Sequence, residues 1–227
     1  MYYMVGLGKT GQAFLKHHKA FVWDDTLTTS HYPLTPPAAV PWHTLQALVL
    51  SPGIPHLYPH AHEAALLAQK YNVPIVCDID VFLKTHPDLF YMGVTGTNGK
   101  STVTALIHHI LNHTHHASLM GGNIGTPVFD LIPKTSQDYC VLELSSYHLE
   151  RLPTWPTKKC IAILTNITPD HLNRHKDMNG YIKAKEIILK APIVFMGIDT
   201  DPTRHLYETH KAHHPCLVPV SIKEFLS

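Results

Sequence analysis

The sequence lacks the features that mark several specialised classes of protein. Only 15% of its 227 residues are charged and its net charge is +1, which argues against a nucleic-acid partner that depends on a general basic field. No apolar run approaches transmembrane length, and no charged and then apolar leader opens the chain. The 44% of hydrophobic residues are typical of a globular chain. We therefore expect a cytoplasmic protein with no membrane and no nucleic-acid partner.

Cysteine is scarce and never forms a C-x-x-C pair. The four cysteines are widely spaced among apolar neighbours, so we expect buried thiols in a reducing compartment at Cys77, Cys140, Cys160 and Cys216. Histidine, in contrast, is abundant, with 20 residues. His109 and His113 are spaced i, i+4 on an expected helix, which suits a metal ion, but no H-E-x-x-H motif or cysteine partner accompanies them. A histidine-rich surface is the favoured interpretation.

Strand-like and helix-like segments alternate along the chain, a pattern typical of an α/β fold with parallel sheets. We expect a first unit, Rossmann-like, over residues 1–88, with strands at 2–5, 21–24, 47–50 and 74–77 and helices at 11–18, 61–71 and 81–84. A proline-rich irregular loop covers residues 32–41, and a linker covers residues 85–88. The second unit, over residues 89–227, has expected strands at 91–95, 117–120, 139–144, 160–166 and 193–196. Its expected helices lie at 100–111, 127–131, 178–190 and 202–210.

The most informative segment is a glycine-rich turn in the second unit. Residues 93–101 read G-V-T-G-T-N-G-K-S, directly after a strand and directly before a helix. Glycines let backbone N–H groups face an anion, the helix N-terminus adds partial positive charge, and Lys100 neutralises a phosphate. Ser101 can place its hydroxyl on Mg²⁺. Because Val94 stands where the Walker A pattern requires its first glycine, the loop is a variant, T-G-T-N-G-K-S over residues 95–101.

A second glycine-rich turn follows the first expected strand. Residues 6–11 read G-L-G-K-T-G, a G-x-G-x-x-G that opens a helix, and Asp24 and Asp25 end the next strand at the position of a ribose-binding acid. Alone, this pattern would suggest a nicotinamide or flavin oxidoreductase, and tight turns also produce it without any ligand. The second phosphate loop favours another interpretation, in which one unit binds a nucleotide-linked substrate and the other binds ATP.

The T-G-T-N-G-K-S loop resembles that of the Mur ligases and of the related folylpolyglutamate synthetases, which are ATP-dependent enzymes that join a carboxylate to an amine. Four further segments resemble Mur ligases: G-G-N-I-G-T-P at 121–127, V-L-E-L-S-S-Y at 141–147, T-N-I-T-P-D-H-L at 165–172 and Y-I-K-A-K at 181–185. Residues 51–54, S-P-G-I, resemble a uridine-side loop. The folylpolyglutamate branch would have Gly-Ser after the loop lysine, whereas Ser101 and Thr102 stand here. These segments favour the branch that adds D-glutamate to UDP-N-acetylmuramoyl-L-alanine.

The resemblance implies a role for each matching residue. The ATP site would comprise Gly96, Thr97, Asn98, Gly99, Lys100, Ser101, Thr102 and Asn123. The UDP-sugar site would comprise Lys9, Thr10, Asp24, Asp25, Gly53, Asn123, Ser145 and His171. Lys100, His171 and Lys185 would be catalytic, and Mg²⁺ would be held by Ser101, Glu143, His171 and a carbamylated Lys185.

Two of these residues also have simpler interpretations. Glu143 is the natural Mg²⁺ ligand because hard cations prefer carboxylate oxygens, and a solvent-facing glutamate fits poorly between Leu142 and Leu144 on a buried strand. His171 lies just past a strand end, where open α/β sheets bind ligands. Lys185 could be a surface lysine of an amphipathic helix. As the carbamylated residue of the family, it would instead gain CO₂ as a neutral amine and present a carboxylate.

The resemblance also has limits that leave three hypotheses. The family's later H-N-x-x-N segment and C-terminal amino-acid-binding domain are absent, and His148 stands where glutamine is usual. The chain is therefore expected to be the N-terminal half of a ligase, ended by a split gene, a frameshift or a chosen boundary, and to show little turnover alone. A separately encoded C-terminal half is one expected partner. The second hypothesis is a UDP-sugar-binding and ATP-binding module without turnover. The third is a Rossmann-type oxidoreductase that uses the first loop.

Overall fold

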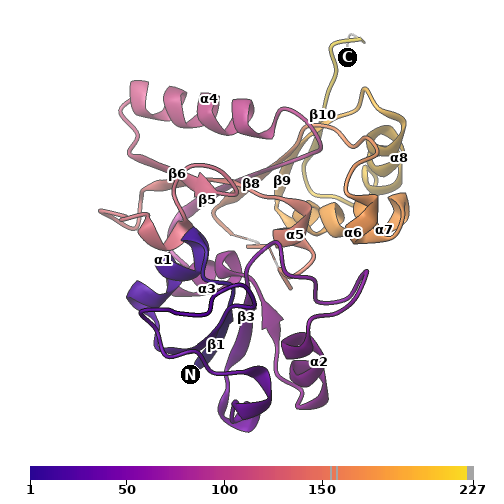
Figure 1. The fold of residues 1–227 in the computed structure, drawn as a ribbon. Coiled ribbons are helices and arrows are strands. Elements are labelled where there is room, and N and C mark those ends of the chain that lie inside the picture. The colour runs from indigo at the N-terminus through magenta and orange to yellow at the C-terminus, as the bar shows by residue number, and fades with distance from the viewer. Residues whose placement is uncertain (154, 157, 224–227) are drawn as a thin grey trace.

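Two parallel β-sheets organise the chain in the computed structural model, which describes residues 1–153, 155–156 and 158–223 (Figure 1). The C-terminal end of the predicted second unit, residues 224–227, lies outside the described residues, and so do residues 154 and 157. Every pair of neighbouring named strands is parallel. The predicted fold class, an α/β protein with parallel sheets, is confirmed. The division into domains at residue 88 stays a prediction.

The first sheet has the strand order β2-β1-β3-β4. Its strands are β1 (Tyr2–Val5), β2 (Ala20–Trp23), β3 (Ala47–Leu50) and β4 (Ile75–Val76). The helices of this part are α1 (Lys9–His17), α2 (Glu63–Lys70) and α3 (Asp78–Thr85), with short 3-10 turns at Pro37–Ala39 and Trp42–Thr44. β3 is buried along its whole length, as a strand covered on both faces requires.

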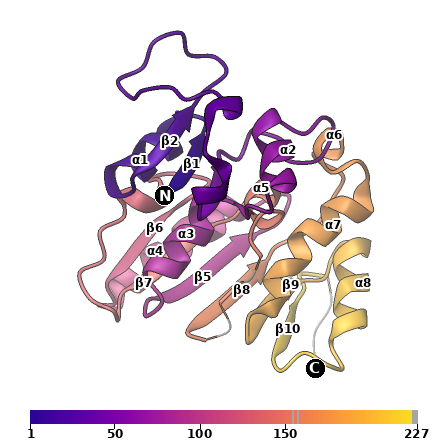
Figure 2. The ribbon, with the colours of Figure 1, turned by 90° about the horizontal axis from the view of Figure 1, so that it is seen from below.

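The second sheet has six strands in the order β10-β9-β8-β5-β7-β6. The strands are β5 (Phe90–Thr95), β6 (Ser118–Gly122), β7 (Tyr139–Glu143), β8 (Cys160–Leu164), β9 (Ile193–Gly197) and β10 (Leu217–Val220). The helices are α4 (Lys100–His113), α5 (Ser146–Leu149), α6 (Leu172–His175), α7 (Met178–Glu186) and α8 (Asp201–His210), with 3-10 turns at Val128–Asp130 and Ile187–Lys190. Figure 2 shows α3 and α7 in front of this sheet when it is seen from below.

The strand that carries the phosphate loop lies in the interior of the second sheet. β5 pairs with β7 on one side and with β8 on the other. The chain leaves β5 toward β6 and β7 and returns to its opposite side at β8, so the strand order reverses next to β5. Ligands of open α/β sheets bind at such a reversal, outside the carboxyl ends of the strands. The segments that follow β5, β7 and β8 are therefore the first place to look for a site.

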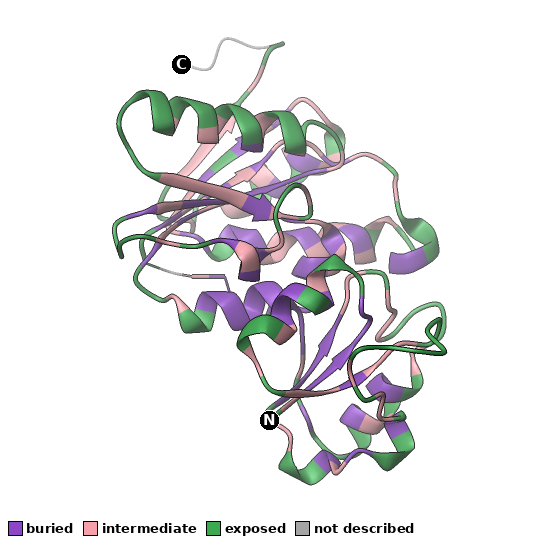
Figure 3. Ribbon diagram, turned by 60° about the vertical axis from the view of Figure 1, so that its left-hand side comes forward, coloured by how far each residue is buried: buried purple, intermediate pink, exposed green. Residues whose placement is uncertain are grey.

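One large core joins the two sheets. It includes Met4 and Phe14 from the first part of the chain, together with Tyr91, Trp155 and Met196 from the second, all fully or almost fully buried. A smaller core lies on the other side of the first sheet and is built around Tyr3 and Trp42. Figure 3 shows the difference in burial between α4, which is exposed along most of its length, and the strands and α3. The shared core therefore packs the first part of the chain against the second.

Several predicted elements have different bounds, and a few were missed. The stretch expected to be a helix at residues 127–131 forms only the 3-10 turn Val128–Asp130, after Pro127. α3 is twice as long as expected, at eight residues, because Asp78 and Asp80 in its first turn favour an earlier start. α5, α6 and β10 were not predicted. Cys77, Cys140 and Cys160 are buried as expected, whereas the expectation for Cys216 was wrong because it is exposed beside β10.

No helix among the described residues is long and apolar enough to cross a membrane.

Candidate functional site

The phosphate loop has the backbone geometry that its glycines predict. Gly96 has φ +148, and a Cβ at this position would lie 1.9 Å from the Thr165 Oγ1, so no other residue fits without a rearrangement. Gly99 has φ +82 and is the N-cap of α4. The helix thus begins at Lys100 with its N-terminal N–H groups directed at the loop, the arrangement that binds anions.

The loop is held in shape by the segment after β8. The Asn98 N–H donates to the Asn166 Oδ1 at 3.0 Å, and the Thr97 N–H donates to the Asn166 backbone oxygen at 2.9 Å. The Asn166 Nδ2 in turn donates to the Asn98 oxygen at 3.0 Å. Asn166 was not among the predicted site residues. Its position just past a strand that neighbours β5 was the sequence signal that could have found it.

Glu143 links the end of β7 to the phosphate loop. Its side chain accepts hydrogen bonds from the Ser101 Oγ at 2.7 Å and from the Asn123 Nδ2 at 2.8 Å, and the residue is 1% exposed. The alternative of a solvent-facing glutamate is therefore wrong. A hydroxyl and a carboxylate oxygen side by side are hard donors that fit Mg²⁺. Within the described residues no group of three or more His, Cys, Asp and Glu side chains could hold a metal, so water and phosphate oxygens would complete its shell.

Lys185, at the end of α7, is a buried lysine beside the loop. It is 1% exposed, and its Nζ donates to the Thr95 Oγ1 at 3.2 Å and to the Gly96 oxygen at 3.0 Å. Lys100 donates to the same Gly96 oxygen at 3.1 Å. Burial, and then the nearby Lys100 charge, lower the pKa of Lys185 to about 7. The alternative of a surface lysine is therefore wrong, and the neutral amine is accessible near physiological pH.

His171 lies beside two tyrosine side chains, Tyr147 and Tyr181. It has φ +52 at the start of α6, and its Nδ1 is 3.0 Å from the Tyr147 hydroxyl. Its ring also lies 6.3 Å from the ring of Tyr181, whose hydroxyl is 3.1 Å from the Thr97 Oγ1. No hydrogen bond between the described side chains joins His171 to Glu143 or Lys185. Its predicted metal role therefore stays a prediction.

Ser145 begins α5 as part of a capping box. The His148 N–H donates to the Ser145 Oγ at 3.3 Å, and the Ser145 N–H donates to the His148 Nδ1 at 3.3 Å. Burial lowers the pKa of His148 to about 3, so this ring is neutral. A neutral imidazole can accept from the backbone as a glutamine side chain does in a capping box. His148 can therefore replace the usual glutamine without changing the local structure around Ser145.

The first glycine-rich turn lines a separate cavity of about 280 Å³. Gly6 has φ +96, and the wall is completed by four predicted residues, Lys9, Thr10, Asp24 and Asp25. The Asp24 carboxylate accepts from the Leu7 N–H at 2.7 Å and from the Thr26 N–H and Oγ1. Burial acts to raise its pKa, but these hydrogen bonds outweigh it and place the pKa of Asp24 below its ordinary value. An ionised carboxylate at a strand end suits a ribose hydroxyl.

A second cavity lies between the two parts of the chain. It has a volume of about 440 Å³ and is lined by Gly53 of the S-P-G-I loop and by Tyr147, Asn173 and Arg174 of the second part. Gly53 was predicted to bind the UDP-sugar with Lys9 and Asp24. The structure instead places Gly53 in this neighbouring cavity, while Ser51 and Ile54 of the same loop line the first one. The S-P-G-I loop thus separates the two cavities.

The fold and the site together define the class of protein. It is an α/β protein with two glycine-rich turns, and one of these is a phosphate loop near a buried carboxylate and a buried lysine. The chain belongs to the Mur ligase family, because the model of the Mur ligase middle domain matches residues 94–226. It is 40% identical over 225 residues to UDP-N-acetylmuramoylalanine--D-glutamate ligase of Rhodospirillum rubrum. The match covers 90% of this chain and 47% of the relative. The chain thus spans about half the length of that relative.

Solved structures of the family support the fold. A ligase from Neisseria meningitides that carries the name UDP-N-acetylmuramate:L-alanyl-gamma-D-glutamyl-meso-diaminopimelate ligase matches with a TM-score of 0.59 at 14% identity, over 97% of this chain and 76% of that chain. The Thermotoga maritima MurF ligase matches with a TM-score of 0.50 at 16% identity, over 98% of this chain and 48% of that chain, and was solved in complex with ADP.

Proposed function

We propose that this chain supplies the sugar-nucleotide site and the ATP phosphate site of a ligase of peptidoglycan precursor synthesis, which joins D-glutamate to UDP-N-acetylmuramoyl-L-alanine in the cytoplasm. The observation that carries the proposal is the contact of Ser101, at the start of α4, with Glu143 at the end of β7. The buried Lys185 contacts Thr95 and Gly96 at the end of the neighbouring strand β5. The 40% identity to a D-glutamate ligase supports the substrate assignment. The cavity at Lys9, Thr10 and Asp24 would take the uridine diphosphate.

The residues of the second part would prepare ATP for transfer. Lys100 and the N–H groups at the start of α4 would bind the phosphates, and Ser101 and Glu143 would hold Mg²⁺, which neutralises charge on the transferred phosphoryl group. A carbamate on Lys185 would add a second carboxylate to this neighbourhood. The low pKa of Lys185 supports that modification, because only a neutral amine adds CO₂.

The proposed reaction requires no protein nucleophile. An oxygen of the alanyl carboxylate attacks the γ-phosphorus, the bond to the β,γ-bridging oxygen breaks, and ADP leaves. The amine of D-glutamate then attacks the carbonyl carbon of the acyl phosphate, phosphate leaves, and the amine loses a proton. The protein contributes position and charge, which are the main sources of catalysis in phosphoryl transfer.

Calorimetry tests the binding half of the proposal. We expect the chain to bind UDP-N-acetylmuramoyl-L-alanine and a non-hydrolysable ATP analogue at one site each, and the lack of binding of both would refute it. NADH fluorescence titration tests the oxidoreductase alternative, for which we expect no binding.

Phosphate release from ATP with both substrates tests the catalytic half. We expect little release with this chain alone and substantial release when the part of the Rhodospirillum rubrum relative that this chain does not match is added. Binding without release in both mixtures would instead favour a module without turnover.

A further inference from the structure

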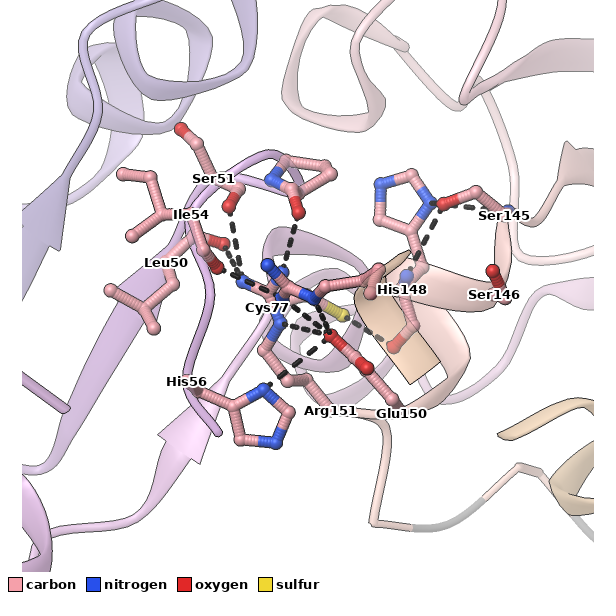
Figure 4. Close-up of polar contacts among 12 residues, drawn as sticks. Leu50, Ser51, Ile54, His56, Cys77, Ser145, Ser146, His148, Glu150 and Arg151 are labelled. Atoms are coloured by element: carbon pink, nitrogen blue, oxygen red, sulfur yellow. Dashed lines mark hydrogen bonds and ion pairs between the residues drawn. The ribbon is translucent and has the colours of Figure 1, made fainter. Parts of the chain in front are cut away.

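Arg151 connects the two parts of the chain at the loop that separates the two cavities (Figure 4). It lies two residues past the end of α5, yet its guanidinium reaches the end of β3 in the first sheet. Its Nη1 donates to the oxygens of Leu50 at 2.9 Å and Ser51 at 3.1 Å, and its Nη2 donates to the Pro52 oxygen at 2.7 Å. A planar fork of donors is needed to bind successive carbonyls in this way, and lysine lacks it.

Arg174 makes a second connection to the same loop. Its Nη2 donates to the Ile54 oxygen at 3.0 Å and to the Glu150 Oε1 at 2.6 Å. Glu150 also lies 3.4 Å from the His56 Nδ1 and 3.7 Å from the Arg151 Nε, so one carboxylate faces both arginines. The two arginines are 3% and 7% exposed. Hydrogen bonds to buried charged groups are among the stronger ones in proteins, so this contact holds the loop firmly.

The loop held by the arginines reaches both proposed ligand sites. Ser51 and Ile54 line the cavity at the first glycine-rich turn, and Gly53 lines the cavity next to Tyr147. On the other side, Ser145, the N-cap of α5, lies two residues past Glu143, which accepts a hydrogen bond from the phosphate-loop Ser101. Arg151 therefore links the end of β3, beside the proposed UDP cavity, to the segment after α5, which follows β7 and the contact of Glu143 with the phosphate loop.

We propose that Arg151, supported by Arg174, is a positioning residue that fixes the sugar-nucleotide cavity relative to the phosphate loop, so that a ligand bound in the first presents its carboxylate at the second. This inference rests on the proposed function for the identity of the ligand, but not for the rigid link itself. A purely structural arginine would add stability without affecting how the two sites cooperate.

The link is tested first without any ligand. Spin labels at Gln69→Cys on α2 and Ala105→Cys on α4, both exposed positions, report the distance between the two parts in a Cys216→Ser background. We expect a narrow distance distribution in the parent, a clearly broader one in Arg151→Lys and an unchanged one in Arg204→Lys, the matched control on α8. An unchanged distribution in a folded Arg151→Lys overturns the inference whatever the protein binds. If Arg151→Lys does not fold, Arg174→Lys tests the same loop with the same expectations.

The consequence for the ligand is tested by two affinities. UDP contacts only the first cavity, whereas UDP-N-acetylmuramoyl-L-alanine extends toward the second part and gains affinity from correct relative placement. We expect the dissociation constant of UDP divided by that of UDP-N-acetylmuramoyl-L-alanine to fall about tenfold in Arg151→Lys, because the second contact depends on geometry. The affinity for UDP should change less, although Ser51 of the held loop lines its cavity. A constant ratio with broadened distances would overturn the positioning role. No binding of either compound to the parent would refute the proposed function and leave the distance measurement as the test of the link.

Discussion

The two glycine-rich turns use the same backbone device but differ in what the neighbouring strand ends supply. At the first turn, the ends of β2 and β3 contribute Asp24 and Ser51. At the second, the ends of β7 and β8 contribute Glu143 and Asn166. Only the second turn has a lysine and a serine at the helix start with a buried carboxylate opposite. A glycine-rich turn therefore defines an anion site, while the adjacent strand ends determine which nucleotide it suits.

The two carboxylates illustrate this difference. Asp24 accepts three hydrogen bonds from its own turn and from Thr26, and is thereby fixed as an ionised acceptor. Glu143 accepts from two side chains, one of which is the serine hydroxyl expected to bind Mg²⁺. The first arrangement suits a ribose hydroxyl, and the second suits a metal-bound phosphate. Changing one turn should therefore leave the ligand of the other unaffected.

The largest effect is expected from Lys100→Ala. Its loss removes the cation nearest the phosphates, and we expect the affinity for an ATP analogue to fall about 100-fold or more, a value typical of a lost charge-assisted hydrogen bond in a phosphate site. The affinity for UDP should not change. Calorimetry with both ligands on one preparation measures this, and equal losses for the two would contradict the separation of the sites.

The next effect is expected from Gly6→Ala. The residue has φ +96, and an added Cβ would lie 2.5 Å from the Ser51 Oγ, so the turn must rearrange. We expect a loss of about 1–3 kcal/mol in the free energy of unfolding, as for other residues forced into this region. UDP binding should weaken while ATP binding persists.

Gly8→Ala is the matched control for Gly6→Ala, because nothing lies within 4 Å of its would-be Cβ and its φ of −64 is ordinary. We expect its urea denaturation midpoint to stay close to that of the parent. A loss at Gly8 as large as that at Gly6 would show that strain is not the cause.

The third effect is a pH dependence of stability from Lys185. Its pKa is about 7 in the folded chain, below the ordinary lysine value of 10.5. Between these values the unfolded state binds the extra proton, so stability should rise with pH from about 7 upward, by at most about 1.4 kcal/mol per pH unit from this group. Below pH 7 both states are protonated and the contribution is flat. Lys185→Met should remove the rise in denaturant titrations, and an unchanged pH profile would contradict the assignment.

The sequence patterns predicted those parts of the site that depend on local chemistry. The glycines of the loop and the carboxylate at the end of β7 follow from their own patterns, whereas Lys185 was singled out only by the resemblance of residues 181–185 to a family segment. Arg151 and Arg174 were not predicted because their partners are backbone oxygens about a hundred residues away, and no motif specifies such a contact. β10 was missed because Pro219 interrupts its pattern, although an edge strand tolerates proline.

The smallest effect is expected from Asp24→Asn, which tests the first turn alone. The asparagine keeps the shape but weakens the bonds from Leu7 and Thr26, each worth about 1 kcal/mol net. We expect a loss of UDP affinity of about tenfold or less, with ATP affinity unchanged.

Because the folded pKa of Asp24 is depressed, its contribution to stability is present above the ordinary pKa of an aspartate and is lost as the pH falls through the folded value. Denaturant titrations from pH 6 downward should therefore show a decline that is smaller in Asp24→Asn than in the parent, and parallel curves would indicate that the carboxylate charge does not hold this turn.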